Sequence, residues 1–275
     1  MNIYNTTVFS YDGKGGNPCP VVLDADKLTF DEMMDIAKEY KLEVGFVLKS
    51  EDQSCDYQFK YFVPTKEMEM CVHATIACVS VLKRIGKLNK SIFSVETLAG
   101  IIDIEIIEND LDFSVKVKQR KSEMSDQVID KFEVAKALNI SENQLLDYPI
   151  KNVSTSRFKL IVGLKNLDIL NSLTPNYDYL WEVCEKVEST GFYPFVKEES
   201  NVYHARQFPN KTGYLEDSAT GVAASALGVY VNDVMKHPFE TIRVYQGFAM
   251  NSPSEITVMN GVESNFVIGK ATIEE

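Results

Sequence analysis

The fold is decided by Glu216-Asp217-Ser218-Ala219-Thr220-Gly221 and by the run that follows it, Val222-Ala223-Ala224-Ser225-Ala226-Leu227-Gly228-Val229-Tyr230-Val231. The run is apolar on nearly every side, which is typical of a helix that is buried all round. The first N–H groups of a helix lack intrahelical partners, and with the helix dipole they favour an anion at its start. The turn therefore predicts either half of an active site or an N-cap on a core helix.

Length and composition indicate a soluble globular protein of one large or two small domains. The chain has 275 residues, 45% of them hydrophobic and 25% charged, enough for a substantial core. No apolar run approaches the roughly 20 residues that span a bilayer. The opening residues lack the basic start and apolar core of a signal peptide. We therefore expect a cytoplasmic protein.

The net charge and the cysteines limit the classes of partner. Lys and Arg total 28 against 40 Asp and Glu, a formal charge of −12, which disfavours nucleic acid and anionic membranes as partners. The five cysteines show no CxxC spacing. This argues against a disulfide framework or a zinc knuckle and fits a reducing compartment.

The order of predicted elements is repeated in the two halves of the chain. Thr29, with Glu32 three residues later, predicts a capped amphipathic helix; Thr174-Pro175 opens a similar one. Strands then follow, at 45–48 and 56–62 in the first half and at 192–196 and 201–208 in the second. The apolar helices come next, after Cys71 and Thr220. Three landmark pairs give nearly one offset: Thr29 to Thr174 is 145, Phe62 to Phe208 is 146, and Cys71 to Thr220 is 149.

This repeat predicts an α+β fold of two pseudo-symmetric lobes. Each lobe should be a curved, mostly antiparallel sheet around one central buried helix, at about 72–85 and 221–235. We place the N-terminal lobe at 1–122 and the C-terminal lobe at 123–275, with the last strand near 265–275 able to join the first lobe. In such pseudo-symmetric lobes both helix N-termini should face one shared cleft. Clefts between domains are a favoured place for small-molecule sites.

Three further residues are candidates for chemistry. His73 falls in the first turn of the first buried helix, where a structural core histidine is the alternative. Glu43 precedes an apolar strand, and burial would suit it to general acid or base work, unless it is a surface loop residue. Cys71 at a helix start would have a lowered pKa, unless it is an inert core filler.

The chain resembles a known family through a series of motifs. They are Gly16-Asn17-Pro18, Glu43 followed by Phe46-Val47, Phe62-Val63-Pro64, Glu67 to Thr75 with His73-Ala74-Thr75, Thr97-Leu98-Ala99-Gly100, Arg206-Gln207-Phe208, Glu216 to Gly221, Gln246-Gly247 and Pro253-Ser254. In this order they resemble the PhzF-like family of phenazine-biosynthesis isomerase relatives, which shares the two-lobed diaminopimelate epimerase fold.

The resemblance implies cofactor-free proton transfer in the cleft between the lobes. The family's catalytic glutamate falls on Glu43, its site histidine on His73 and its second carboxylate on Asp217. The implied substrate is a small cyclic amino- or hydroxy-carboxylate, and a homodimer is expected. The positions expected to bind the substrate are Asn17, Cys71, Val72, Thr220, Gly221 and Val222.

Two departures from the family pattern leave alternatives open. Family members commonly have Gly where this chain has Val72, and Ser where it has Val222. These changes predict a different substrate or an impaired protein that only binds small molecules. Epimerases of this fold use two facing cysteines, whereas here Cys71 is matched by Thr220. An epimerase would therefore need Cys71 opposed by a carboxylate.

Cofactors are not expected. The chain has three histidines, no clustered metal-ligand spacing and no Rossmann glycine pattern after a strand. We therefore expect the purified protein to carry no stoichiometric metal, flavin, nicotinamide or pyridoxal group.

Overall fold

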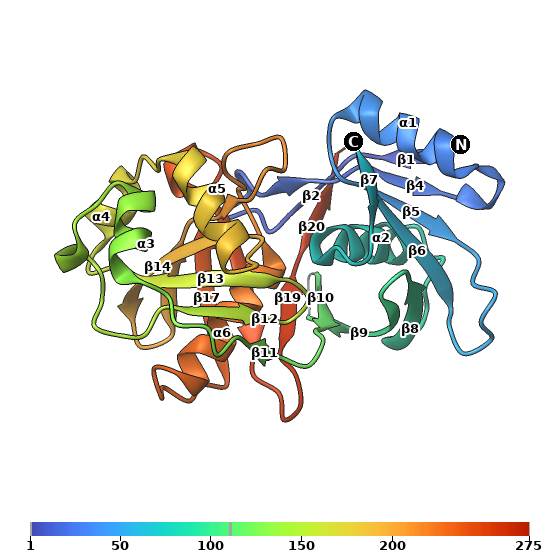
Figure 1. Cartoon of the computed structure of the whole chain (residues 1–275). Helices are drawn as coiled ribbons and strands as arrows, with labels where there is room; N and C mark the ends of the chain where they lie inside the picture. Colours follow the sequence, from blue (N-terminus) through green and yellow to red (C-terminus); the bar gives the residue numbers. More distant parts are fainter. Residues whose placement is uncertain (1, 110–111, 275) are drawn as a thin grey trace. The chain divides into compact units, whose positions relative to one another are not determined.

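The computed structural model describes residues 2–109 and 112–274 (Figure 1). The chain divides into two compact units: unit 1 is Met1–Lys118 with Ile268–Glu275, and unit 2 is Gln119–Val267. Among the described residues, the helices are all too short or too polar to span a membrane.

The sheet of unit 1 alternates parallel and antiparallel strand pairs. β1 and β4 are antiparallel, β4 and β5 parallel, β5 and β6 antiparallel, and β6 and β8 parallel. β9 and β10 continue it as an antiparallel hairpin, and β7 adds to β6. The bounds are β1 Asn2–Tyr4, β4 Val21–Leu23, β5 Val44–Leu48, β6 Tyr57–Val63, β7 Lys66–Met68, β8 Ile92–Thr97, β9 Gly100–Glu108 and β10 Phe113–Lys118.

A second, three-stranded sheet of unit 1 joins the two ends of the described chain. β2 (Thr6–Val8) pairs antiparallel with both β3 (Asn17–Pro18) and β20 (Ala271–Ile273). β20 follows β19 (Phe266–Gly269), which runs across the boundary between the units. The last strand therefore belongs to the unit in which the chain starts.

Helix α1 (Phe30–Tyr40) has the expected cap. The Glu32 N–H donates to the Thr29 hydroxyl, and the Thr29 N–H donates to the Glu32 carboxylate at 2.8 Å. The helix buries Met33 and Ala37 in an apolar cluster with residues of β5 and β6. A short 3₁₀ turn, η1 (Ala25–Lys27), precedes it.

Helix α2 (Val72–Arg84) is the buried centre of unit 1. Every residue from Val72 to Leu82 is buried. The helix packs on strands of the main sheet and on β2 and β20 (Figure 1). It is covered by both sheets, which explains why it has no polar face.

Unit 2 repeats the strand pattern of unit 1. β12 and β13 are antiparallel, β13 and β14 parallel, β14 and β15 antiparallel, β15 and β17 parallel, and β17 and β18 antiparallel. This is the order of pair types from β1 to β9 in unit 1. The bounds are β11 Glu123–Met124, β12 Lys151–Ser154, β13 Phe158–Gly163, β14 Gly191–Glu199, β15 Val202–Ala205, β16 Phe208–Pro209, β17 Thr241–Gln246 and β18 Ser254–Met259.

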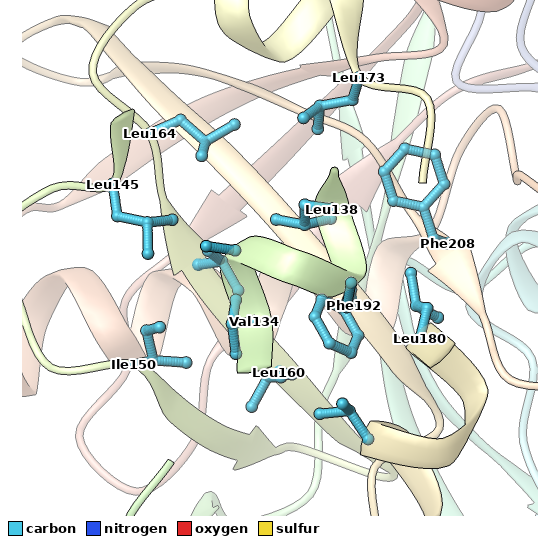
Figure 2. Close-up of a cluster of buried hydrophobic side chains, with 14 of the residues drawn as sticks. Val134, Leu138, Leu145, Ile150, Leu160, Leu164, Leu173, Leu180, Phe192 and Phe208 are labelled. Carbon is cyan, nitrogen blue, oxygen red and sulfur yellow. The ribbon is translucent and has the colours of Figure 1, made fainter. Parts of the chain in front are cut away.

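The helices of unit 2 cover both faces of its sheet. α6 (Gly221–Asp233) packs on β12, β13 and β18 and is buried from Ala223 to Val231. The other helices pack on the sheet through an apolar cluster. Figure 2 shows Val134 and Leu138 of α3 in this cluster near Leu160 and Phe192 of the sheet. The remaining bounds are α3 Lys131–Leu138, η2 Glu142–Gln144, α4 Leu167–Ser172, α5 Tyr177–Lys186 and η3 Phe248–Met250.

The fold is therefore the predicted α+β fold, with one buried helix in each unit. Some element boundaries differ from the prediction. The helix expected at Thr174 begins at Tyr177, because the Asn176 side chain accepts from the Tyr179 N–H. Strand β8 and helix α4 were not predicted.

Candidate active site

The position of Glu43 is set by the close approach of β5 to α2. α1 ends at Tyr40, and Lys41 takes a left-handed conformation with φ of 55°. Glu43 follows and leads into β5. A Cβ atom on Gly45 would lie 2.6 Å from Cys78 Sγ on α2, so only glycine allows β5 to pass this close. The approach brings the Glu43 side chain to the start of α2.

Three side chains meet at that point. The Cys71 thiol donates to Glu43 Oε2 at 3.1 Å, and His73 Nε2 lies 3.2 Å from the same oxygen. Cys71 Sγ is also 3.3 Å from His73 Nδ1. The side chain of His73 is 8% exposed and that of Glu43 is 21% exposed. The carboxylate is therefore the member of this Glu43–Cys71–His73 cluster that solvent or a ligand reaches most easily.

The Cys71 thiol does not have the lowered pKa expected for a helix start. Burial raises the pKa of Cys71 well above its ordinary value, and the neighbouring Glu43 carboxylate raises it further. A hydrogen bond from the Ala74 N–H lowers the pKa but does not offset these effects. At neutral pH the residue is a protonated thiol, which agrees with its role as donor to Glu43.

Two buried hydroxyls fix the first turn of α2. The Thr75 hydroxyl donates to the Cys71 carbonyl at 2.8 Å, and it lies 2.7 Å from the Tyr61 hydroxyl of β6. Because the Thr75 hydroxyl donates its proton to the Cys71 carbonyl, the Tyr61 hydroxyl must be the donor to the Thr75 oxygen. The sheet thus fixes the backbone that carries Cys71 and His73.

Asp217 lies in unit 2, before the start of α6. The Thr220 hydroxyl donates to Asp217 Oδ2. The Asp217 N–H donates to the Gln207 carbonyl at 3.1 Å, and its carbonyl accepts from Gln246 Nε2 at 2.7 Å. Both the side chain and the backbone of Asp217 are therefore held in place.

Gln246 organises this turn; it belongs to the Gln246-Gly247 motif, to which no individual role was assigned from the sequence. Its Oε1 accepts from the Thr220 N–H at 3.2 Å and from the buried Tyr193 hydroxyl at 2.9 Å. The next residue, Gly247, has φ of 78°, and a Cβ there would lie 2.1 Å from the Ser252 carbonyl. The available signal was a polar residue followed by glycine at the end of an apolar strand.

The two adjacent carboxylates have different surroundings. Glu216 accepts from Arg206 Nε and from its terminal nitrogen, each at 2.7 Å, and both side chains are nearly buried. The other Arg206 nitrogen donates to the carbonyls of Leu170 and Leu173, each at 3.0 Å. Glu216 thus has a structural role in a buried bidentate ion pair, whereas Asp217 bonds to the residue that begins α6.

The other predicted site residues lie at separate places. Asn17 is in β3 and pairs with Val8 in unit 1. Val72 is the buried first residue of α2. Gly221 is the buried first residue of α6, and the carbonyl of Val222 accepts from the Thr155 hydroxyl at 3.4 Å. Within unit 1 the structure brings Glu43, Cys71 and His73 together. A cleft shared with Asp217 stays a prediction.

The Glu43–Cys71–His73 cluster is also a possible set of metal ligands. Each of the three residues offers one ligand atom, and these atoms lie within 4.8 Å of one another. Glu43 is 28 positions before Cys71, so the sequence spacing could not reveal this group.

Comparison with known proteins identifies the family. The model of the phenazine biosynthesis-like family, PhzC-PhzF, matches residues 6–275. The chain belongs to this family. It is 36% identical over 238 residues to a protein of Clostridium acetobutylicum named as an uncharacterized isomerase, an alignment that covers 84% of this chain and 78% of the relative.

Solved structures of PhzF-like proteins show the same fold. A PhzF-family phenazine biosynthesis protein of Bacillus anthracis has a TM-score of 0.86 at 29% identity, with 100% of this chain and 98% of that one covered. A hydroxyproline epimerase of Agrobacterium vitis, solved with trans-4-hydroxy-L-proline, has a TM-score of 0.63 at 11% identity, over 99% of this chain and 91% of that one. The second likeness concerns the fold alone.

Proposed function

We propose that this protein is a PhzF-like isomerase that moves a proton between carbons of a small carboxylate, with Glu43 as the general acid and base. The observation that carries the proposal is the convergence of Cys71 Sγ and His73 Nε2 on Glu43 Oε2. Membership of a family with several relatives named uncharacterized isomerases supports the reaction class. The proposal needs no cofactor.

The residues suggest how the proton would move. Taking a proton from carbon requires a base that is partly removed from water and oriented in advance. Cys71 and His73 orient Glu43 Oε2, while the side chain keeps 21% exposure on its open side. Glu43 would accept the proton there and return it to another carbon of the same substrate. The N–H groups at the helix starts would hold the substrate carboxylate.

Asp217 is proposed as the second carboxylate of the site. Its carboxylate accepts from the Thr220 hydroxyl at the start of α6, so the hydrogen bond orients it. We propose that it supports the substrate or a proton in transit, which is a smaller task than that of Glu43. The proposed substrate is a cyclic amino- or hydroxy-carboxylate.

An epimerase that uses Cys71 is the second candidate. The hydrogen bond from Cys71 to Glu43 favours it, because the carboxylate could take the thiol proton and produce the thiolate. The residue at the start of α6 is Thr220, whose hydroxyl is bonded to Asp217. Such an enzyme would thus use one cysteine and one carboxylate. Cys71→Ser should abolish the epimerase reaction but spare proton transfer by Glu43.

Solvent exchange tests the proposal directly. A panel of cyclic and acyclic amino- and hydroxy-carboxylates is incubated with the protein in heavy water, and deuterium at carbon is measured by NMR. For any substrate that exchanges, Glu43→Gln should slow exchange by about 10²–10⁴-fold, because the amide cannot accept the proton. Asp217→Asn should slow it less.

Glu39→Gln is the matched control, because it makes the same change on the exposed face of α1, four residues from Glu43. It should leave exchange unchanged. Exchange that persists in Glu43→Gln would overturn the proposal. Carboxylates that bind without any exchange would instead support the impaired binding protein predicted from Val72 and Val222.

A further inference from the structure

We infer that the Glu43–Cys71–His73 cluster is a binding site for Zn²⁺ and that the metal switches off proton transfer at Glu43. The set is one thiol, one imidazole and one carboxylate, the three ligand types that zinc takes in proteins. Zinc sites with three protein ligands leave a fourth position open, as exchangeable and catalytic sites do. The metal site itself does not depend on the proposed function, but its inhibitory effect does.

The distances between the ligand atoms fit a tetrahedral ion. Zinc bond lengths of about 2.0–2.3 Å place neighbouring ligand atoms about 3.4–3.6 Å apart. The three pairs here are Cys71 Sγ to Glu43 Oε2 at 3.1 Å, His73 Nε2 to Glu43 Oε2 at 3.2 Å, and Cys71 Sγ to His73 Nε2 at 3.9 Å. Each pair is within about 0.5 Å of the tetrahedral spacing, so small side-chain rotations would complete the site.

The surroundings are built to hold the ligands in place. Cys71 and His73 are separated by one residue at the start of a buried helix, and the Cys71 carbonyl is fixed by Thr75. The Ala74 N–H donates to Cys71 Sγ and fixes its position, and a bound metal cation would displace the thiol proton. Only the Glu43 side has appreciable exposure, so the metal would enter there and the open position would face the same way.

Metal binding would compete with catalysis for the Glu43 carboxylate. On coordination the thiol proton leaves to solvent, the Cys71 thiolate and His73 Nε2 bind the ion, and Glu43 Oε2 gives its lone pair to the metal. Coordination of Oε2 by Zn²⁺ withdraws electron density from the whole Glu43 carboxylate, so neither of its oxygens remains a base strong enough to take a proton from carbon. The proposed inhibitor and the substrate therefore exclude each other at Glu43.

Cobalt titration tests the site without requiring any activity. The metal-free protein is titrated with CoCl₂, and the expected result is a thiolate-to-cobalt charge-transfer band with tetrahedral d–d bands that saturate at one ion per chain. ZnCl₂ should displace the cobalt. Cys71→Ser should abolish the charge-transfer band and weaken Zn²⁺ binding by at least about 100-fold, because a residue that coordinates the ion contributes more than one that only holds a ligand in place.

Cys55→Ser is the matched control, since Cys55 lies in a loop of the same unit and is only partly buried. It should bind cobalt like the unmodified protein. His73→Gln serves as a second ligand variant, and circular dichroism verifies that both ligand variants fold. A missing charge-transfer band, or one that survives in folded Cys71→Ser, would overturn the proposal.

The two proposals can fail independently. Where a substrate exchanges, added ZnCl₂ should stop exchange with the concentration dependence measured for cobalt displacement, and EDTA should restore it. Exchange that is insensitive to bound zinc would overturn the inhibitory effect. Cobalt binding in a protein with no exchange activity would leave the metal site standing and count only against the isomerase.

Discussion

Arg206 is a buried cation whose hydrogen-bonding groups are all used in unit 2. It pairs with Glu216 through two nitrogens and donates to backbone carbonyls with the third. Its guanidinium also lies 4.9 Å from the Phe208 ring centroid. Removing one partner of such a pair leaves an uncompensated charge in a poorly solvated place, which costs more than the intact pair contributes.

Arg206→Met should lower the free energy of unfolding by about 3–5 kcal/mol, because Glu216 and two carbonyls lose their donor. Urea denaturation followed by circular dichroism measures the loss. Lys186→Met is the control, because Lys186 forms an exposed pair with Glu133 and should cost at most about 1 kcal/mol. A loss below 1 kcal/mol in Arg206→Met would contradict the structural role given to this pair.

The different roles of the two carboxylates in the Glu216-Asp217 motif could not be predicted from the residue types alone. Glu216 and Asp217 are adjacent and chemically alike. The difference comes from Arg206, which lies beside Glu216 because the neighbouring residues Gln207 and Asp217 form an antiparallel bridge. The same limit explains the wrong expectation for the Cys71 pKa. A helix start is visible in the sequence, whereas burial and the charge of Glu43 appear only in the folded unit.

At the scale of elements, the contact between β5 and α2 controls the site. Gly45→Ala would place a methyl group 2.6 Å from Cys78 Sγ. Because both elements are buried, the strand or the helix must shift, at a cost of about 1–3 kcal/mol. We expect the thermal midpoint to fall and solvent exchange to slow, because the shift separates Glu43 from Cys71 and His73.

Gly45→Ala combined with Cys78→Ala provides the internal control. The second change removes the sulfur that the methyl group meets, so the double variant should recover exchange relative to Gly45→Ala alone. Recovery of stability is expected to be partial, since Cys78 is itself buried. Unchanged exchange in Gly45→Ala would show that the strand spacing does not position Glu43.

Local capping signals were predicted well, and signals that depend on distant contacts were not. The cap at Thr29 is confirmed, since it uses groups only three residues apart. Thr174 was a wrong helix start, because Asn176 is an equally good cap and its own N–H is fixed to Ala137 of α3. The Glu43–Cys71–His73 cluster could not be seen in the sequence for the same reason, because Glu43 joins it only through the fold.

At the scale of the whole molecule, the internal repeat was the most reliable prediction. Both buried helices are present, and the order of parallel and antiparallel pairs agrees between the units. The predicted strand at 201–208 is split into β15 and β16, yet both parts keep one register on β14. Hydrophobic patterning predicts which segments are buried. It does not predict the interruption between β15 and β16, where the side chain of Arg206 makes its contacts.

The molecule buries several thiols and phenols, and this should limit its stability in alkali. Burial is the main cause of a raised pKa for these groups, which is about 12 for both Cys184 and Tyr203. The others with raised pKa values are Cys19, Cys71, Cys78, Tyr61, Tyr193 and Tyr230. Above the unfolded cysteine pKa of about 8.5, the folded protein holds more protons than the unfolded chain.

The free energy of unfolding should therefore be nearly constant up to about pH 8 and fall as the pH rises further. Each buried thiol contributes a loss of about 1.4 kcal/mol per pH unit until its folded pKa is reached. Urea midpoints measured from about pH 7 to about pH 10 check this. In Cys184→Ala the free energy of unfolding should fall less steeply with pH, by about 1.4 kcal/mol per pH unit, because one fewer proton is released on unfolding. A midpoint that stays flat to pH 10 would contradict the burial of these groups.

The return of the last strand to unit 1 has a consequence for synthesis on the ribosome. Unit 2 is one uninterrupted segment, while α2 of unit 1 packs against β20, which is translated after it. Unit 2 can thus finish folding on the nascent chain while unit 1, begun first, still waits for its last strand. Throughout that interval the apolar side of α2 that β20 will cover is available to chaperones, so a unit that is begun before unit 2 is completed after it.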